Sequence, residues 1–145
     1  MSRNAIADAL LTLLTRTSAF NTSGRRVLPW TKVDSQPAIF VRDVGDHYAP
    51  RGTGMPPKVI MECEAWIYSN AGKDSLAIPG AALADLLDTV EALLKPAAGA
   101  PSRTQTLGGT VVHAWIEGKI DVHPGDLDGQ AIAVVPISIL CPILN

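Results

Sequence analysis

The chain has 145 residues, a length typical of one domain whose core needs neither disulfides nor metal to hold it together. Twelve Lys and Arg residues oppose fourteen Asp and Glu residues, and the resulting net charge of -2 disfavours generic DNA binding, which needs a basic excess. Charged residues make up only 18% of the chain, below the roughly 25% of ordinary soluble domains, so we expect part of its surface to be covered by other subunits. Residues 1–145 are expected to form a single domain.

The N-terminal half predicts one helix and then two strands. Residues 2–16 carry apolar side chains at helical spacing, with Ser2 as the cap. Residues 17–30 mix polar residues with glycine and predict a surface connection. Strand-forming residues then predict a strand over 38–41 and a second one over 58–68.

The segment between these two strands is expected to be a long loop. Residues 45–57 contain six Gly and Pro residues, too many breakers for regular structure. Loops of this length in compact domains are usually functional or disordered. We therefore predict that residues 45–57 project from the hairpin and contact a neighbouring molecule.

The C-terminal half predicts a second helix and two further strands. The helix is expected to begin at Pro79 and to stop at Lys95, because a leucine-rich stripe lies between these residues and a proline follows. A third strand is predicted over 112–122, with a bulge at Gly118. After a turn rich in Asp and Gly, a fourth strand is predicted over 130–141.

This order of elements predicts an α+β fold. Helix, strand, strand, helix, strand, strand (α-β-β-α-β-β) is typical of a mostly antiparallel β-sheet flanked by two main helices, here expected on one face. Residues 134–144 are apolar on both faces. The last strand is therefore either central in the sheet or covered by another chain.

The cysteines and the apolar segments bear on the compartment. Cys63 and Cys141 lie in apolar runs without a short metal-ligand spacing, which favours a reduced, buried pair, with a disulfide as the alternative. Asp8 interrupts the N-terminal segment, so no signal peptide is expected. The longest apolar stretch, residues 131–144, contains prolines and is shorter than the ~18 residues of a membrane-spanning helix, so no membrane segment is expected.

The sequence offers little support for an enzyme. His113 and Glu117 share a strand face, but four residues of extended chain separate them by about 13 Å, too far for one metal. His47 and His123 stand alone, and no G-x-S-x-G motif is present. The glycine pair at 108–109 precedes a strand, whereas a phosphate cradle follows one. We predict no catalytic residue, no metal ligand and no cofactor.

Surface aromatic residues are the better candidates for function. Trp115 lies on the polar face of its strand, and Trp66 shares a face with Glu62 and Glu64. Two interpretations stay open: contact with a partner, or the two tryptophans packing on each other across the sheet. The candidate interface residues are Trp66, Trp115, His47, Tyr48 and Arg51.

Several segments together resemble one family. They are the N-terminal helix, residues 26–30 (RVLPW), residues 36–41 (QPAIFV) with the glycine-rich loop after them, the helix over 86–94 and the strand over 107–118. In this order, over most of the chain, the pattern resembles tail-terminator proteins of long-tailed bacteriophages, of the minor tail protein U type.

The resemblance implies a structural virion protein. It implies a helix-flanked sheet and a homo-hexameric ring that stops growth of the tail tube and joins the tail to the head. The implied partners are the tail tube protein, a neck or head-completion protein, and genomic DNA that passes through the lumen without sequence-specific binding. The implied location is the head-proximal end of the tail, after assembly in the host cytoplasm, without a membrane. The family has no catalytic residues to carry over and implies no cofactor.

Two alternatives stay open. The first is another assembly role, as a neck or head-completion adaptor or as a tail-tube subunit. The second belongs to a different class, a small enzyme or ligand-binding domain that uses the face of His113 and Glu117. Such a domain needs a concave pocket with convergent polar groups.

Overall fold

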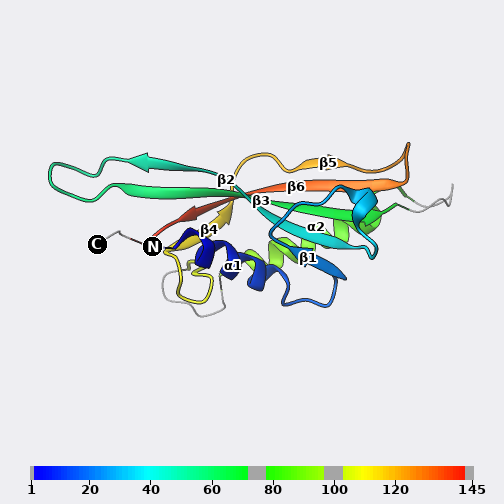
Figure 1. Cartoon of the computed structure of the whole chain (residues 1–145), viewed down its shortest axis with the longest axis horizontal. Helices are drawn as coiled ribbons and strands as arrows, with labels where there is room; N and C mark the ends of the chain where they lie inside the picture. Colours follow the sequence, from blue (N-terminus) through cyan, green and yellow to red (C-terminus); the bar gives the residue numbers. More distant parts are fainter. Residues whose placement is uncertain (1, 72–77, 97–102, 143–145) are drawn as a thin grey trace.

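A computed structural model of the chain describes residues 2–71, 78–96 and 103–142, and places two helices on one face of a six-stranded sheet (Figure 1). The order of the strands across the sheet is β1-β2-β3-β6-β4, and β5 also pairs with β6. The elements are α1 (Arg3–Leu14), β1 (Thr22–Gly24), the 3-10 helix η1 (Trp30–Lys32), β2 (Ala38–Ala49), β3 (Lys58–Asn70), α2 (Ala81–Leu94), β4 (His113–Ile116), β5 (Asp121–His123) and β6 (Gln130–Leu140).

The pair β3 and β6 forms the centre of the sheet. The two strands run antiparallel, in register from Ile60 opposite Leu140 to Asn70 opposite Gln130. β2 pairs antiparallel with the other side of β3, whereas β4 and β5 pair antiparallel with successive parts of β6. Only the short β1 runs parallel to its neighbour. The predicted α+β fold is confirmed, and β6 is central, as one of the two sequence interpretations required; residues 143–144 of that apolar run lie outside the described residues.

Alternating side chains fix which face of the sheet the helices cover. Successive residues of a strand point to opposite faces, so every second residue of β3 and β6 enters the core. The core side chains of these two strands are Val59, Met61, Cys63, Ala65 and Ile67 in β3 and Ala131, Ala133, Val135, Ile137 and Ile139 in β6. The helices add Ile6, Ala7, Leu10, Leu13 and Leu14 from α1 and Leu83, Leu86, Val90 and Leu94 from α2.

Local chemistry sets the helix ends close to where the sequence predicts them. The Ser2 hydroxyl accepts a hydrogen bond from the Ala5 N–H at 3.2 Å, which caps the start of α1. α2 follows Gly80, whose φ of 78° is accessible to glycine at little cost, and ends before Pro96. Both predicted helices are confirmed, with α2 starting two residues after Pro79.

The prediction of an irregular loop over 45–57 is wrong in part. Gly45 to Ala49 belong to β2, paired with Glu62 to Lys58 of β3 after a bulge at Val44. Hydrogen bonds to a long partner strand outweigh the low strand propensity of a single glycine. The irregular loop therefore comprises only residues 50–57. β6 pairs with β3 only as far as Ile60, so this end of the β2–β3 hairpin projects beyond the rest of the sheet, as Figure 1 shows.

Two further sequence predictions need correction. The connection over 17–30 contains β1, whose three residues are too few to show a periodic pattern. The single strand predicted over 112–122 is two strands, β4 and β5, separated around Gly118. The φ of Gly118 is 100°, a conformation outside the strand region, so the chain leaves β6 there and returns to it.

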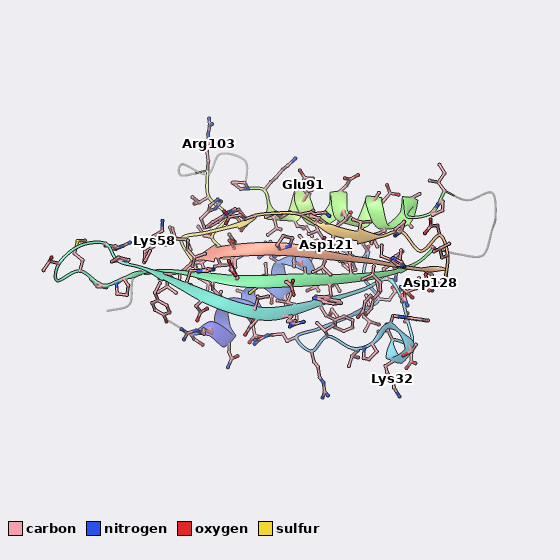
Figure 2. The ribbon with its side chains drawn as sticks, turned by 90° about the horizontal axis from the view of Figure 1, so that it is seen from above. Lys32, Lys58, Glu91, Arg103, Asp121 and Asp128 are labelled. Carbon is pink, nitrogen blue, oxygen red and sulfur yellow. The ribbon has the colours of Figure 1, made fainter. Side chains whose placement is uncertain are left out.

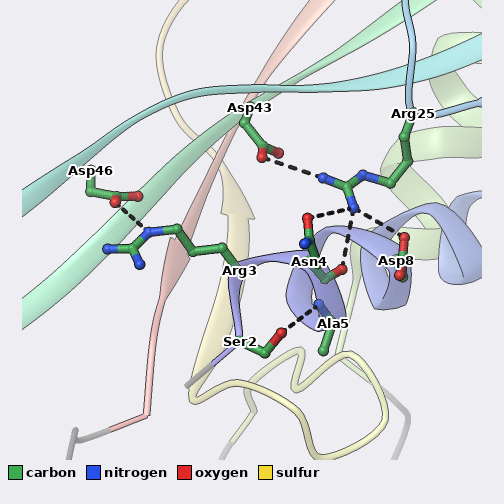
Figure 3. A network of polar contacts seen from close by, with 8 residues as sticks. All are labelled: Ser2, Arg3, Asn4, Ala5, Asp8, Arg25, Asp43 and Asp46. Atoms are coloured by element: carbon green, nitrogen blue, oxygen red, sulfur yellow. Dashed lines mark hydrogen bonds and ion pairs between the residues drawn. The ribbon is translucent and has the colours of Figure 1, made fainter.

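Two arginines tie α1 to β2, as Figure 3 shows. Arg3 Nε donates to the Asp46 carboxylate at 2.7 Å. Arg25 reaches Asp8 of α1 at 3.2 Å through one guanidinium nitrogen and Asp43 of β2 at 3.3 Å through the other. The helix is thereby held at the base of the projecting hairpin.

Shortening a core side chain of α1 tests this packing. Leu10 is fully buried, so Leu10→Ala removes buried methyl groups and leaves a cavity, which should lower the free energy of unfolding by about 2–5 kcal/mol. Urea unfolding followed by circular dichroism measures the change. The exposed Thr12→Ala on the same helix is the control and should change stability by about 0.5 kcal/mol or less. An equal effect of both substitutions would contradict the assignment of the core.

Candidate interaction surface

The face of the sheet opposite the helices is only partly covered. At one end, Phe40 and Tyr68 form a second apolar cluster with Ala38, and the segment from Val27 to Val33 packs on it. The Tyr68 hydroxyl donates to the Leu28 carbonyl at 2.6 Å, which fixes this segment over the sheet. Farther along β3 and β6, side chains of this helix-free face stay half-buried, and they include Ile60, Glu62, Glu64, Val134, Pro136 and Leu140.

Trp66 and Trp115 both belong to the helix-free face. Trp66 lies opposite Val134 and Trp115 opposite Ser138, and opposed residues of a sheet point to the same side. Four residues of β6, about 13 Å, separate the two positions along the strand. The tryptophans therefore do not pack on each other, and that alternative is wrong.

Each tryptophan has a local partner instead. Trp66 packs against the second cluster, and its indole N–H donates to Glu64 at 3.4 Å. Trp115 stacks on His113, with ring centroids 5.1 Å apart and 18° between the ring planes, and its indole N–H donates to Glu117 at 3.2 Å. Both rings stay half-exposed, and their role in an interface stays a prediction.

The projecting hairpin carries the other three candidate residues. His47 lies against Glu62 of the helix-free face at 3.0 Å. Tyr48 points the other way, and its hydroxyl accepts from the Arg3 guanidinium at 2.7 Å. Arg51 is exposed in the loop. The structure therefore gathers His47, Tyr48 and Arg51 in one hairpin but places Trp66 and Trp115 elsewhere on the sheet.

The three histidines lie apart from one another, and each has a different partner. His113 Nδ1 accepts the Gln105 N–H at 3.0 Å, while His123 lies 3.5 Å from Asp128 at the far end of the sheet. Among residues 2–71, 78–96 and 103–142, no three His, Cys, Asp or Glu side chains are grouped so that they could hold a metal ion. The absence of catalytic and metal-binding residues stays a prediction.

Both cysteines are free and buried, as the sequence predicts. Burial raises the pKa of the Cys63 thiol to about 12 and also raises the pKa of Cys141. Within the described residues, neither helix combines the length and the apolar composition needed to cross a membrane.

A groove of about 580 Å³ lies between the end of α2 and the edge strand β4. Gln105 connects the two sides of the groove. Its side-chain amide donates to the carbonyls of Leu93 and Lys95 at the end of α2, at 3.3 and 3.0 Å, and its backbone N–H donates to His113 of β4. The groove is lined by Glu91, Leu94, Lys95, Pro96, Arg103, His113, Ala114, Trp115, Ile116 and Ile120. Sequence reasoning missed it, because its walls are distant along the chain and no motif marks them.

Comparisons with known proteins add distant structural likeness. No family model matches the chain, and no curated protein matches it. A solved chain from the virion of a native gene transfer agent particle superposes with a TM-score of 0.49 and 13% sequence identity, covering 91% of this chain and 83% of that chain. At this level of similarity, the function has to be argued from the residues of the chain itself.

The buried thiols give a test of the site's chemistry. The folded state holds the Cys63 proton more tightly than the unfolded state, so Cys63 reduces stability as the pH rises from 9.0 towards about 12 and leaves it unaffected below this range. At pH 8 we expect both thiols of the folded protein to react with a chromogenic disulfide roughly 100-fold more slowly than in urea, because neither the thiolate nor access to it is available. Thr12→Cys adds an exposed thiol that should react at once. Fast reaction of Cys63 in the folded protein would contradict its burial.

Proposed function

We propose that the protein is a structural component of a phage-like virion that closes the end of the tail tube as a ring and forms the joint between tail and head. The projecting β2–β3 hairpin carries this proposal. It extends beyond the sheet of its own chain, and Tyr48 and Met55 of the hairpin are more than half exposed. The family resemblance of the sequence supplies the specific role.

The hairpin has the surface of a docking element. Tyr48 and Met55 are each 55% exposed, and Arg51 and Lys58 give the end of the hairpin positive charge. An extended strand pair without a packed face is of low stability in water. Here Arg3 ties its base to α1, so the arm is held in place while its end stays free for a neighbouring molecule.

A ring would cover part of the surface of each subunit, which would explain why only 18% of the residues are charged. Rings need a heterologous interface, in which one patch of each subunit fits a different patch of the next. The groove beside β4 is a candidate for one of these two patches. Six copies, the number that the resemblance implies, would close the ring around a lumen through which DNA passes without sequence-specific contacts.

The ring would join two different partners. One side would meet the tail tube protein, and the other a neck or head-completion protein, at the head-proximal end of the tail. A neck adaptor and a tail-tube subunit are the competing assembly roles. The behaviour of the purified protein distinguishes the three roles. A terminator binds the end of a tail tube and stops its growth, an adaptor binds filled heads, and a tube subunit polymerises.

Measurement of the oligomeric mass tests the ring. Light scattering of the purified protein, together with negative-stain electron microscopy, should give a closed ring of about six chains, because cyclic assemblies of one chain bury the same two patches at every contact. Addition of the ring to growing tubes should fix their length. A protein that stays monomeric alone and on assembled tails would contradict the proposal.

Shortening the hairpin tests its docking role. Ala49 lies directly opposite Lys58, so replacing residues 50–57 by Asn-Gly closes the strands with a two-residue turn. We expect an unchanged circular dichroism spectrum and an intact ring that no longer joins its partner, because Met55 and Arg51 are removed. Tyr48 and its contact with Arg3 are kept, which separates docking from folding. Particles assembled at normal yield with this variant would show that the loop has no docking role.

A further inference from the structure

Leu127 is unusual among the described apolar residues because its side chain is 91% exposed. It lies in the turn between β5 and β6, with Asp126 before it and Asp128 after it. A turn of this kind usually carries polar residues, and a leucine at its tip gains nothing from its own fold.

Hydrogen bonds within the turn define its backbone conformation. Gly125 has a φ of 80°, and a side chain at this position would lie 2.7 Å from the carbonyl carbon of Gln130. The N–H of Gly129 donates to the Gly125 carbonyl at 2.9 Å, and Asp128 accepts from the Gln130 N–H at 3.1 Å. The Gln130 bond also lowers the pKa of Asp128, which keeps this carboxylate charged. The hydrogen-bonded turn therefore carries Leu127 on its solvent-exposed side.

The groove between α2 and β4 has the complementary chemistry. Its floor is apolar, with Leu94, Ala114 and Ile116. Two of its lining residues, Lys95 and Arg103, carry positive charge, against the single acid Glu91. Within the described part of the chain, no ion pair joins Arg103 or Asp126 to another residue.

A turn cannot fill the groove of its own chain. The turn ends where β6 begins at Gln130, whereas β4 at the groove pairs with Ile137 to Leu140. At least seven residues of extended strand, about 23 Å, lie between them. Figure 2 shows the same separation, with Asp128 at one end of the molecule and Arg103 at a distance along one long edge.

We infer that the β5–β6 turn of one copy docks in the α2–β4 groove of a second copy, with Leu127 on the apolar floor and Asp126 beside Arg103. The inference rests on the ring of the proposed function and identifies one of its contacts. The two patches lie at different places on the chain, so the contact is heterologous and repeats around a ring. An apolar side chain at the centre of the contact with charged residues at its rim is the arrangement found in protein interfaces.

Single substitutions and a charge exchange test the contact. Leu127→Asp should raise the concentration at which half of the protein is assembled about tenfold or more, with an unchanged circular dichroism spectrum. Met55→Asp is the control: Met55 is an apolar residue 55% exposed at the end of the β2–β3 hairpin, away from the proposed contact, and its replacement should leave assembly of the ring unchanged. Asp126→Arg and Arg103→Glu should each weaken assembly, and the double variant should restore it, because the pair is re-formed with opposite signs. Rescue of this kind is not expected from residues that only stabilise the fold.

The outcomes separate this contact from the ring itself. The contact is overturned, and the ring is not, if Leu127→Asp assembles at the same concentration as the wild-type protein. The same holds if the Asp126→Arg, Arg103→Glu double variant assembles no better than the two single variants. A wild-type protein that stays monomeric overturns the ring.

In that case cross-linking decides about the contact alone. A chain with Leu127→Cys is mixed at high concentration with a chain with Ile120→Cys, because Ile120 lines the groove and both native cysteines are buried. A disulfide between the two chains supports the contact, and its absence under oxidising conditions overturns it. Met55→Cys in place of Leu127→Cys is the control and should give no such product, because Met55 lies at the end of the β2–β3 hairpin. Preferential cross-linking of Leu127→Cys to a different virion protein would also overturn the assignment of a second copy as the occupant.

Discussion

The one-sided covering of the sheet is the constraint on which the rest of the structure depends. Both helices pack on the same face, where the β6 side chains and, apart from Ser69, the β3 side chains are apolar and buried. Burial of this face supplies most of the hydrophobic stabilisation, at roughly 25 cal/mol for each Å² removed from water. On the other face the segment from Val27 to Val33 covers one end, and side chains of β3 and β6 beyond it stay half-buried.

The periodic alternation of buried and exposed side chains explains which elements the sequence predicts well. α2 and β3 carry uninterrupted patterns of period 3.6 and 2, and their packing on the core agrees with these patterns. β2 is longer than predicted because its pairing with β3 continues through Gly45, and pairing of this kind is a non-local interaction. β1 is three residues long and exists only because β2 offers an edge beside it. A pattern within one segment cannot show either effect.

For the candidate interaction surface, less could be predicted from the sequence than for the fold. Sequence reasoning singled out Trp66 and Trp115 by their faces, and the faces are right. Their partners are not visible in the sequence, because stacking of Trp115 on His113 and packing of Trp66 beside Tyr68 depend on strand register. Leu127 was passed over because Asp and Gly around it indicate a turn, and the exposure of one leucine in a turn is a property of the folded chain.

The proposed ring also requires that opposite charges lie at different places on each subunit, and the charges of this chain are arranged in this way. The acids of the β5–β6 turn and the cations around the groove lie apart, so their fields do not cancel within one subunit. Between copies they attract, whereas two turns or two grooves repel each other. Repulsion between like patches disfavours a closed two-fold dimer and leaves head-to-tail contact as the favoured arrangement. Thus the near-neutral net charge of the chain is compatible with strongly directional assembly, because the direction comes from where the charges lie and not from their sum.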